Sequence, residues 1–124
     1  MKVLLDVSTL IALIWPSHVH HHQATAWSQG KTMAVCPITQ LGFLRVSSGA
    51  LNTPMPAVLA ALESFMKDSE VEFIPCDLSA LKGLAAPDSA RTTDWYLANL
   101  AHKHGMKWAT LDQKATHPAA EVIR

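Results

Sequence analysis

The sequence predicts an α/β fold: an open, mainly parallel sheet of four to five strands with helices on both faces, in a single domain covering residues 1–124. Short apolar runs alternate along the chain with longer stretches of helical character. This alternation favours parallel strands joined by crossover helices. A chain of 124 residues, 49% of them hydrophobic, suits one buried core. No internal repeat or linker-like stretch divides it.

The first half of the chain opens with an apolar strand, and capping or helix-breaking residues mark the elements that follow. Ser8 is a residue type that caps helices, and Pro16 stops the first helix. Gly30 closes the second helix, and Pro37 ends the second strand. The expected elements are strands at 2–5 and 32–36 and helices at 8–15, 18–30 and 38–49.

The second half continues the alternation. Pro54 and Pro56 bracket the start of a helix, and the alternating stretch VEFIP is typical of a short strand. The stretch from Ala90 to Gly105 has a cap, an apolar ridge and a C-terminal glycine, which makes it the clearest helix. The expected elements are helices at 57–68 and 90–105, a helical turn or two at 77–85, strands at 71–75, 106–111 and 120–123, and loops at 48–56 and 86–91.

Composition narrows the class of protein. Ten basic and ten acidic residues cancel, so net charge does not indicate nucleic-acid or membrane binding, although a local patch or a metal could still attract a polyanion. No apolar run reaches about 18 residues, and the N-terminal run carries Asp6 and lacks a signal cleavage site. Cys36 and Cys76 lack the spacing of a metal site and are expected to be reduced. These features favour a cytoplasmic protein with no membrane partner.

Aspartates stand where an α/β sheet places its ligands. Asp6 follows the run KVLL, Asp112 follows KWATL, and Asp94 opens the clearest helix. Ligands of open α/β sheets bind beyond the carboxyl ends of the strands. Each aspartate also has a simpler explanation, since the helix dipole favours Asp94 and a cap or turn would satisfy the other two.

Together the three aspartates predict a metal site. Converging carboxylates repel one another unless a cation lies between them, and oxygen ligands suit Mg²⁺ or Mn²⁺. Such ions commonly act on phosphate substrates, which points to hydrolysis by in-line attack.

Four blocks of sequence carry a family resemblance. They are LLDVSTLIAL, CPITQLGFLRV, TTDWYLANLAHKHG and WATLDQ, and they span residue 1 to about 116. In order and spacing they resemble the motifs of PIN-domain ribonucleases, and most closely the VapC-like toxins of type II toxin–antitoxin modules. The resemblance implies a PIN-like fold and an Mg²⁺- or Mn²⁺-dependent endoribonuclease that hydrolyses RNA phosphodiester bonds. It also implies a homodimer held inactive by a cognate antitoxin that covers the acidic pocket.

The resemblance also implies roles for individual residues. Asp6, Asp94 and Asp112 match the family's acidic residues, which makes them the expected catalytic metal ligands. Ser8 and Thr110 match small hydroxyl residues that line the pocket and approach the substrate.

Two positions depart from the family's pattern. Gln40 stands where glutamate is usual; its amide oxygen can assist catalysis but brings no charge, so one metal ion is better supported than two. A related subset of these toxins resembles this chain in carrying TQLG, which favours an active variant. Trp95 stands where alanine is common. Arg45, about one helical turn beyond Gln40, is expected either to contact the RNA backbone or to be a surface residue favoured by the helix dipole.

The stretch HVHHH, from His18 to His22, is the densest group of possible metal ligands. On a helix, His18 and His22 would lie one turn apart and could take up Zn²⁺ or Ni²⁺. No third ligand stands at a familiar spacing, so solvated or interface histidines are expected.

Other functions remain open. A PIN-fold protein that binds RNA or a partner without cutting fits the missing glutamate at position 40. A receiver-like phosphotransfer domain also places an aspartate after its first strand, but it needs a lysine after a late strand, and Lys114 is a poor candidate. The apolar residues of 38–46 and 57–66 fit a dimer or antitoxin surface as well as they fit internal packing.

Overall fold

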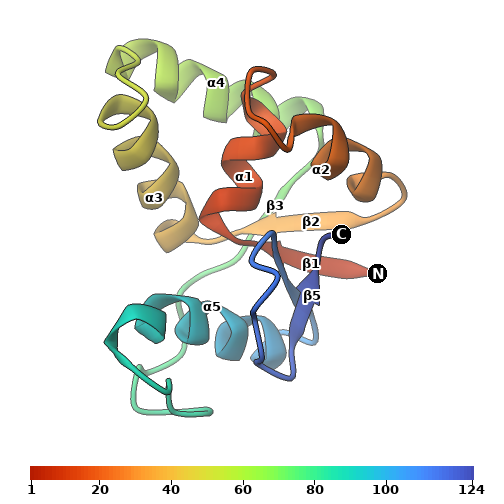
Figure 1. The fold of residues 1–124 in the computed structure, drawn as a ribbon, viewed down its shortest axis with the longest axis vertical. Coiled ribbons are helices and arrows are strands. Elements are labelled where there is room, and N and C mark those ends of the chain that lie inside the picture. The colour runs from red at the N-terminus through yellow and green to blue at the C-terminus, as the bar shows by residue number, and fades with distance from the viewer.

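A five-stranded parallel sheet forms the centre of the computed structural model, which describes residues 1–124 (Figure 1). The strands are β1 (Lys2–Leu5), β2 (Thr32–Val35), β3 (Glu72–Phe73), β4 (Lys107–Thr110) and β5 (Ala120–Val122). Their order is β3-β2-β1-β4-β5, and every neighbouring pair is parallel. The chain runs outward from β1 through β2 to β3, then crosses to β4 on the other side of β1 and runs outward to β5. A switch point therefore lies between β1 and β4. The predicted open parallel sheet is confirmed.

Helices cover both faces of the sheet. Figure 1 shows α1, α2, α3 and α4 on one side of the sheet and α5 on the other. The helices are α1 (Val7–Ile14), α2 (His21–Ser28), α3 (Pro37–Ser48), α4 (Met55–Asp68) and α5 (Thr92–Lys103), with a short 3₁₀ turn, η1 (Ser89–Arg91), leading into α5. None of the helices has the length and apolar character needed to span a membrane.

The sheet separates two hydrophobic cores. Along β1, Val3 and Leu5 point into the core beneath α1–α4, whereas Leu4 points into the core beneath α5. All three side chains are fully buried. Burial on both faces explains why the strands read as continuous apolar runs rather than as alternating ones. The central strands are therefore packed on both faces and give a well-packed base to the residues at their carboxyl ends.

The close contact of α1 with α3 depends on Gly42. A Cβ atom at this position would lie 2.4 Å from Cγ2 of Val7, well inside contact distance. Gly42 therefore lets α3 approach the start of α1, directly after Asp6. The glycine that weakens this helix in isolation has a packing role in the fold.

The structure corrects two predicted element ends near the N-terminus. Asp6, rather than Ser8, is the N-cap of α1, because its carboxylate accepts a hydrogen bond from the Val7 amide. The second helix begins at His21 and not at residue 18. The His20 amide instead donates to Nδ1 of His18, a local bond that competes with helix formation.

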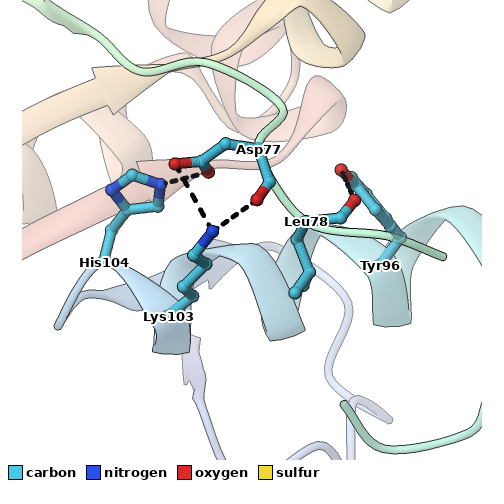
Figure 2. A network of polar contacts seen from close by, with 5 residues as sticks. All are labelled: Asp77, Leu78, Tyr96, Lys103 and His104. Carbon is cyan, nitrogen blue, oxygen red and sulfur yellow. Dashed lines mark hydrogen bonds and ion pairs between the residues drawn. The ribbon is translucent and has the colours of Figure 1, made fainter. Parts of the chain in front are cut away.

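The predicted helical turns at 77–85 are wrong, because this segment is a loop held by side chains of α5. Tyr96 Oη donates to the Leu78 carbonyl over 2.7 Å, as Figure 2 shows. Further along, Asn99 Nδ2 donates to the Leu84 carbonyl and Asn99 Oδ1 accepts from the Leu84 amide. Gly83 lies between these contacts with φ +84°, a left-handed conformation that breaks helical geometry.

Candidate active site

Asp6 is the most firmly held residue at the switch point. It follows β1 directly and is 8% exposed. Its Oδ1 accepts from the Val7 amide at 2.7 Å, and its Oδ2 accepts from Ser8 Oγ at 3.1 Å and from Thr110 Oγ1 at 2.8 Å. Burial raises the pKa of Asp6, and these three hydrogen bonds oppose that rise. The carboxylate is thus fixed in position by donors from both sides of the switch point.

Thr110 joins the ends of β1 and β4. Its hydroxyl donates to Asp6 and also accepts a 3.1 Å hydrogen bond from the Asp112 amide. Asp112 is exposed, and its Oδ1 accepts from the Lys114 amide at 2.9 Å, a local turn that orients the side chain. Ser8 and Thr110, predicted to line the pocket, therefore contact Asp6 directly.

Asp94 approaches from the other face of the sheet. It lies in the first turn of α5, is half-buried, and makes no side-chain hydrogen bond or ion pair. Burial raises the pKa of Asp94 to about 6, and the charges of Asp6 and Asp112 add to the rise. The two repulsive contributions place the three predicted aspartates within electrostatic reach of one another.

The donor set fits a hard divalent cation, although the side chains do not yet form a cage for one. No three histidine, cysteine, aspartate or glutamate side chains are grouped closely enough to hold a metal ion together. Mg²⁺, however, is usually held by one or two carboxylates, with water and phosphate oxygens completing its shell. None of the three aspartates is paired with a lysine, arginine or histidine. Their negative charge is therefore free to attract a cation.

Two other predicted residues lie apart from the aspartates. Gln40 is half-buried on α3, and its Nε2 donates to Sδ of Met66 on α4 at 3.2 Å. Arg45 lies in the last turn of α3 with an exposed side chain that makes no ion pair. The structure does not bring either side chain into hydrogen-bonding contact with Asp6, Asp94 or Asp112.

The sequence interpretation missed one supporting residue, Thr9. Its side chain is fully buried, and its hydroxyl donates to the Ala109 carbonyl of β4 at 3.1 Å. The Asp6 amide donates to the same carbonyl at 2.9 Å. The sequence does contain a sign of this role, because Thr9 is a polar residue on the apolar face of the first helix.

The histidine-rich segment lies outside this site. His18 precedes α2, whereas His22 lies in its first turn, so the two do not share a helical face. His21 Nδ1 forms a 2.8 Å hydrogen bond with the Ala12 carbonyl, which docks the start of α2 on α1. Burial, together with the neighbouring His20 and His21, lowers the pKa of His18.

These features define a class: a PIN-like α/β protein with an acidic site at the switch point of its sheet. No protein-family model matches the chain. Ribonuclease VapC39 of Mycobacterium tuberculosis is 35% identical, over 90% of this chain and 89% of the relative. Ribonuclease VapC29 of the same species is 36% identical, over 98% and 94%, and Ribonuclease VapC38 is 32% identical, over 88% and 84%. The chain belongs to the VapC family of ribonucleases.

A solved structure shows the same fold. It is the crystal structure of VapBC2 from Rickettsia felis bound to a DNA fragment from their promoter. The matching chain has a TM-score of 0.65 and 15% sequence identity, and the match covers 98% of this chain and 97% of that one. The five-stranded parallel sheet with helices on both faces is therefore a shared architecture.

Proposed function

We propose that this protein is the toxin of a type II toxin–antitoxin pair and that it hydrolyses RNA phosphodiester bonds with the help of Mg²⁺ or Mn²⁺. It acts in the cytoplasm as a homodimer, and a cognate antitoxin silences it by covering the acidic site. Family membership supports the ribonuclease activity. The metal, the site residues, the dimer and the compartment are the parts to be tested.

The observation that carries the proposal is a group of carboxylates without any counter-charge. Asp6, Asp94 and Asp112 come from two strand ends and a helix start, and no basic side chain pairs with them. This arrangement destabilises the ionised form of Asp94, because burial and the charges of Asp6 and Asp112 raise its pKa. Carboxylates arranged at this cost are typical of functional sites.

In the proposed mechanism these three aspartates hold the metal ion. When bound, the ion lowers the pKa of a water molecule and offsets charge on the scissile phosphate. Ser8 and Thr110 keep the Asp6 carboxylate oriented and favour its ionised form through their hydrogen bonds.

Two residues on α3 complete the proposed site. Gln40 assists by orienting water through its amide oxygen, while its Nε2 stays bonded to Met66. Arg45, free of any ion pair at the surface, contacts the RNA backbone.

Apolar residues on α3 and α4 support the proposed protein partners. Leu41 is 60% exposed on α3, and Leu59 is 49% exposed on α4. Large exposed apolar side chains on two adjacent helices favour a protein–protein contact. We assign this surface to the antitoxin or to the second protomer.

The test is cleavage of total cellular RNA by purified, antitoxin-free protein in Mg²⁺, Mn²⁺ or EDTA. Asp6→Asn, prepared identically, controls for contaminating nuclease. Asp68→Asn, an exposed change at the end of α4, is the matched control for altered charge. Cleavage that needs metal and is lost only in Asp6→Asn is the expected result; metal-independent cleavage, or cleavage retained by Asp6→Asn, would contradict the proposal.

A second function, RNA or partner binding without cleavage, is favoured by one observation. The Gln40 amide donates to Met66 and brings no charge to the aspartates. Gln40→Glu separates the two functions. If the unaltered protein is silent on all RNA and Gln40→Glu cleaves, the binding function is correct; if the unaltered protein cleaves, Gln40 is a tolerated variant.

A further inference from the structure

A cavity of about 890 Å³ lies at the amino-terminal edge of the sheet, away from the three aspartates. Lys2 and Lys107, the first residues of β1 and β4, line it on one side. Asn99 and Lys103 of α5 and Leu84 of the loop before this helix line it on another. Its volume lies in the range of about 300–1,000 Å³ that is typical of small-molecule sites.

The wall of the cavity formed by residues 78–84 is held at its first end by α5. Figure 2 shows Asp77 between a lysine and a histidine. His104 Nε2 lies 2.7 Å from its Oδ1, and Lys103 Nζ lies 3.5 Å from its Oδ2. Beside it, Tyr96 donates to the Leu78 carbonyl. These contacts fix the loop before any ligand arrives.

The second end of the wall is tied by a buried polar cluster. Asn99 forms hydrogen bonds with both the amide and the carbonyl of Leu84. Its Oδ1 also lies 2.8 Å from Nε2 of His117. Because His117 Nδ1 accepts from the Ala119 amide, its Nε2 carries the proton and donates to Asn99. Burial lowers the pKa of His117, so this ring is neutral. The polar groups of Asn99 and His117 are therefore bonded within the protein, and the cavity wall is formed without a ligand.

The lining combines apolar side chains with positive charge. Leu78, Leu84 and Met106 supply apolar surface, and no aspartate or glutamate lines the cavity. Of the three lysines, Lys2 is paired with Glu72 at 3.3 Å, and Lys103 is paired with Asp77. Lys107 has no acidic partner; its Nζ has only the Pro118 carbonyl, at 3.5 Å. Among the three lysines, Lys107 is thus the one whose ammonium group is left for a ligand.

We propose that this cavity binds a small organic anion with an apolar body, such as a medium-chain carboxylate or an aryl sulfonate. The head group pairs with Lys107, and the body lies against Leu78, Leu84 and Met106. The lining carries lysines and no acidic residue, so its charge complements an anion better than a neutral molecule. The preformed wall also favours a small-molecule ligand. The site is separate from the acidic site, and its test requires no ribonuclease activity.

The probe is 8-anilinonaphthalene-1-sulfonate, followed by its fluorescence, with decanoate as competitor. The expected result is one saturable site per chain that decanoate empties. Lys107→Glu reverses the charge of the proposed partner, and Leu84→Asp places a carboxylate on the half-exposed rim. Each should weaken binding by at least about tenfold. Lys67→Glu reverses the charge of an exposed lysine at the end of α4 and should leave probe binding unchanged.

Three results would overturn the proposal. One is the absence of saturable binding by the unaltered protein. A second is unchanged binding by Lys107→Glu and Leu84→Asp, both shown to be folded by circular dichroism. The third is a lower mass of Lys107→Glu than of the unaltered protein on sedimentation, with no probe binding by the unaltered protein. A second copy of the chain would then cover this face.

Discussion

Two aspartates at opposite ends of α5 differ in the partners that the fold gives them. Asp77 lies beside the last turn, where Lys103 and His104 surround it, and the His104 hydrogen bond lowers its pKa. Asp94 lies in the first turn without a partner, and burial raises its pKa to about 6. The carboxylate that holds a loop in place has a lysine and a histidine of the same chain as partners. A carboxylate left without them at a switch point is available for a cation from solution.

The largest expected effect is on catalysis. Asp94→Asn should reduce metal-dependent RNA cleavage by more than the roughly 10–100-fold that is typical when only the support of a metal ligand is lost. Asp77→Asn should leave the cleavage rate unchanged. Rates measured on one RNA in Mg²⁺ check both variants. Equal losses in the two would remove the functional distinction between the ends of α5.

Thr110→Val should give the next largest effect. The change keeps the side-chain shape but removes the hydroxyl that donates to Asp6 and accepts from the Asp112 amide. We expect a loss of about 10–100-fold in cleavage, because the variant disturbs the orientation of two metal ligands. Excess Mg²⁺ should restore part of the rate in Thr110→Val but none in Asp94→Asn. Full activity of Thr110→Val would show that the bridge is dispensable.

Stability should respond to the charge of Asp94 in a pH-dependent way. Its folded pKa of about 6 exceeds its ordinary value of 3.8, so the folded state binds the proton more tightly than the unfolded state does. The contribution of Asp94 to the free energy of unfolding is therefore most favourable below about pH 4. It falls as pH rises to about 6 and then stays low.

Asp94→Asn removes this penalty. In EDTA at pH 7–8 the variant should be more stable by on the order of 1 kcal/mol, a figure reduced for the partial exposure of the side chain. The gain should vanish near pH 4. Urea unfolding across this pH range measures it, and a variant that is less stable at pH 8 would contradict the proposed repulsion.

The smallest effect is expected at the other end of the helix. Asp77→Asn should lower the melting temperature slightly, because it weakens the attraction of Lys103 and His104 for the loop. High salt should reduce the difference between Asp77→Asn and the unaltered protein. An increase in melting temperature would show that Asp77 is not a structural carboxylate.

Features that depend on local sequence were predictable. Strands such as β1 are buried on both faces, so KVLL reads as a continuous apolar run, and the aspartates that follow the strands could be placed at one edge of the sheet. Asp6 and Asp112 were found in this way, and Asp94 was found at the start of the clearest helix. Their mutual repulsion is consistent with the expected convergence.

Features that depend on distant partners were not predictable. The loop at 78–84 takes its hydrogen bonds from Tyr96 and Asn99, which lie on a later helix, so its helical composition was misleading. The bond of Gln40 to Met66 likewise joins two helices. Competition between Asp6 and Ser8 for the cap of α1 was settled by geometry at the end of β1, which sequence alone does not describe.

Binding of Mn²⁺ to the protein, followed by electron paramagnetic resonance, tests the central claim most directly. The unaltered protein and Asp77→Asn should bind Mn²⁺ with equal affinity, and Asp94→Asn should bind at least about tenfold more weakly. Mn²⁺ binding of equal strength in Asp94→Asn, or no binding by the unaltered protein, would contradict a metal site built on the unpaired aspartates.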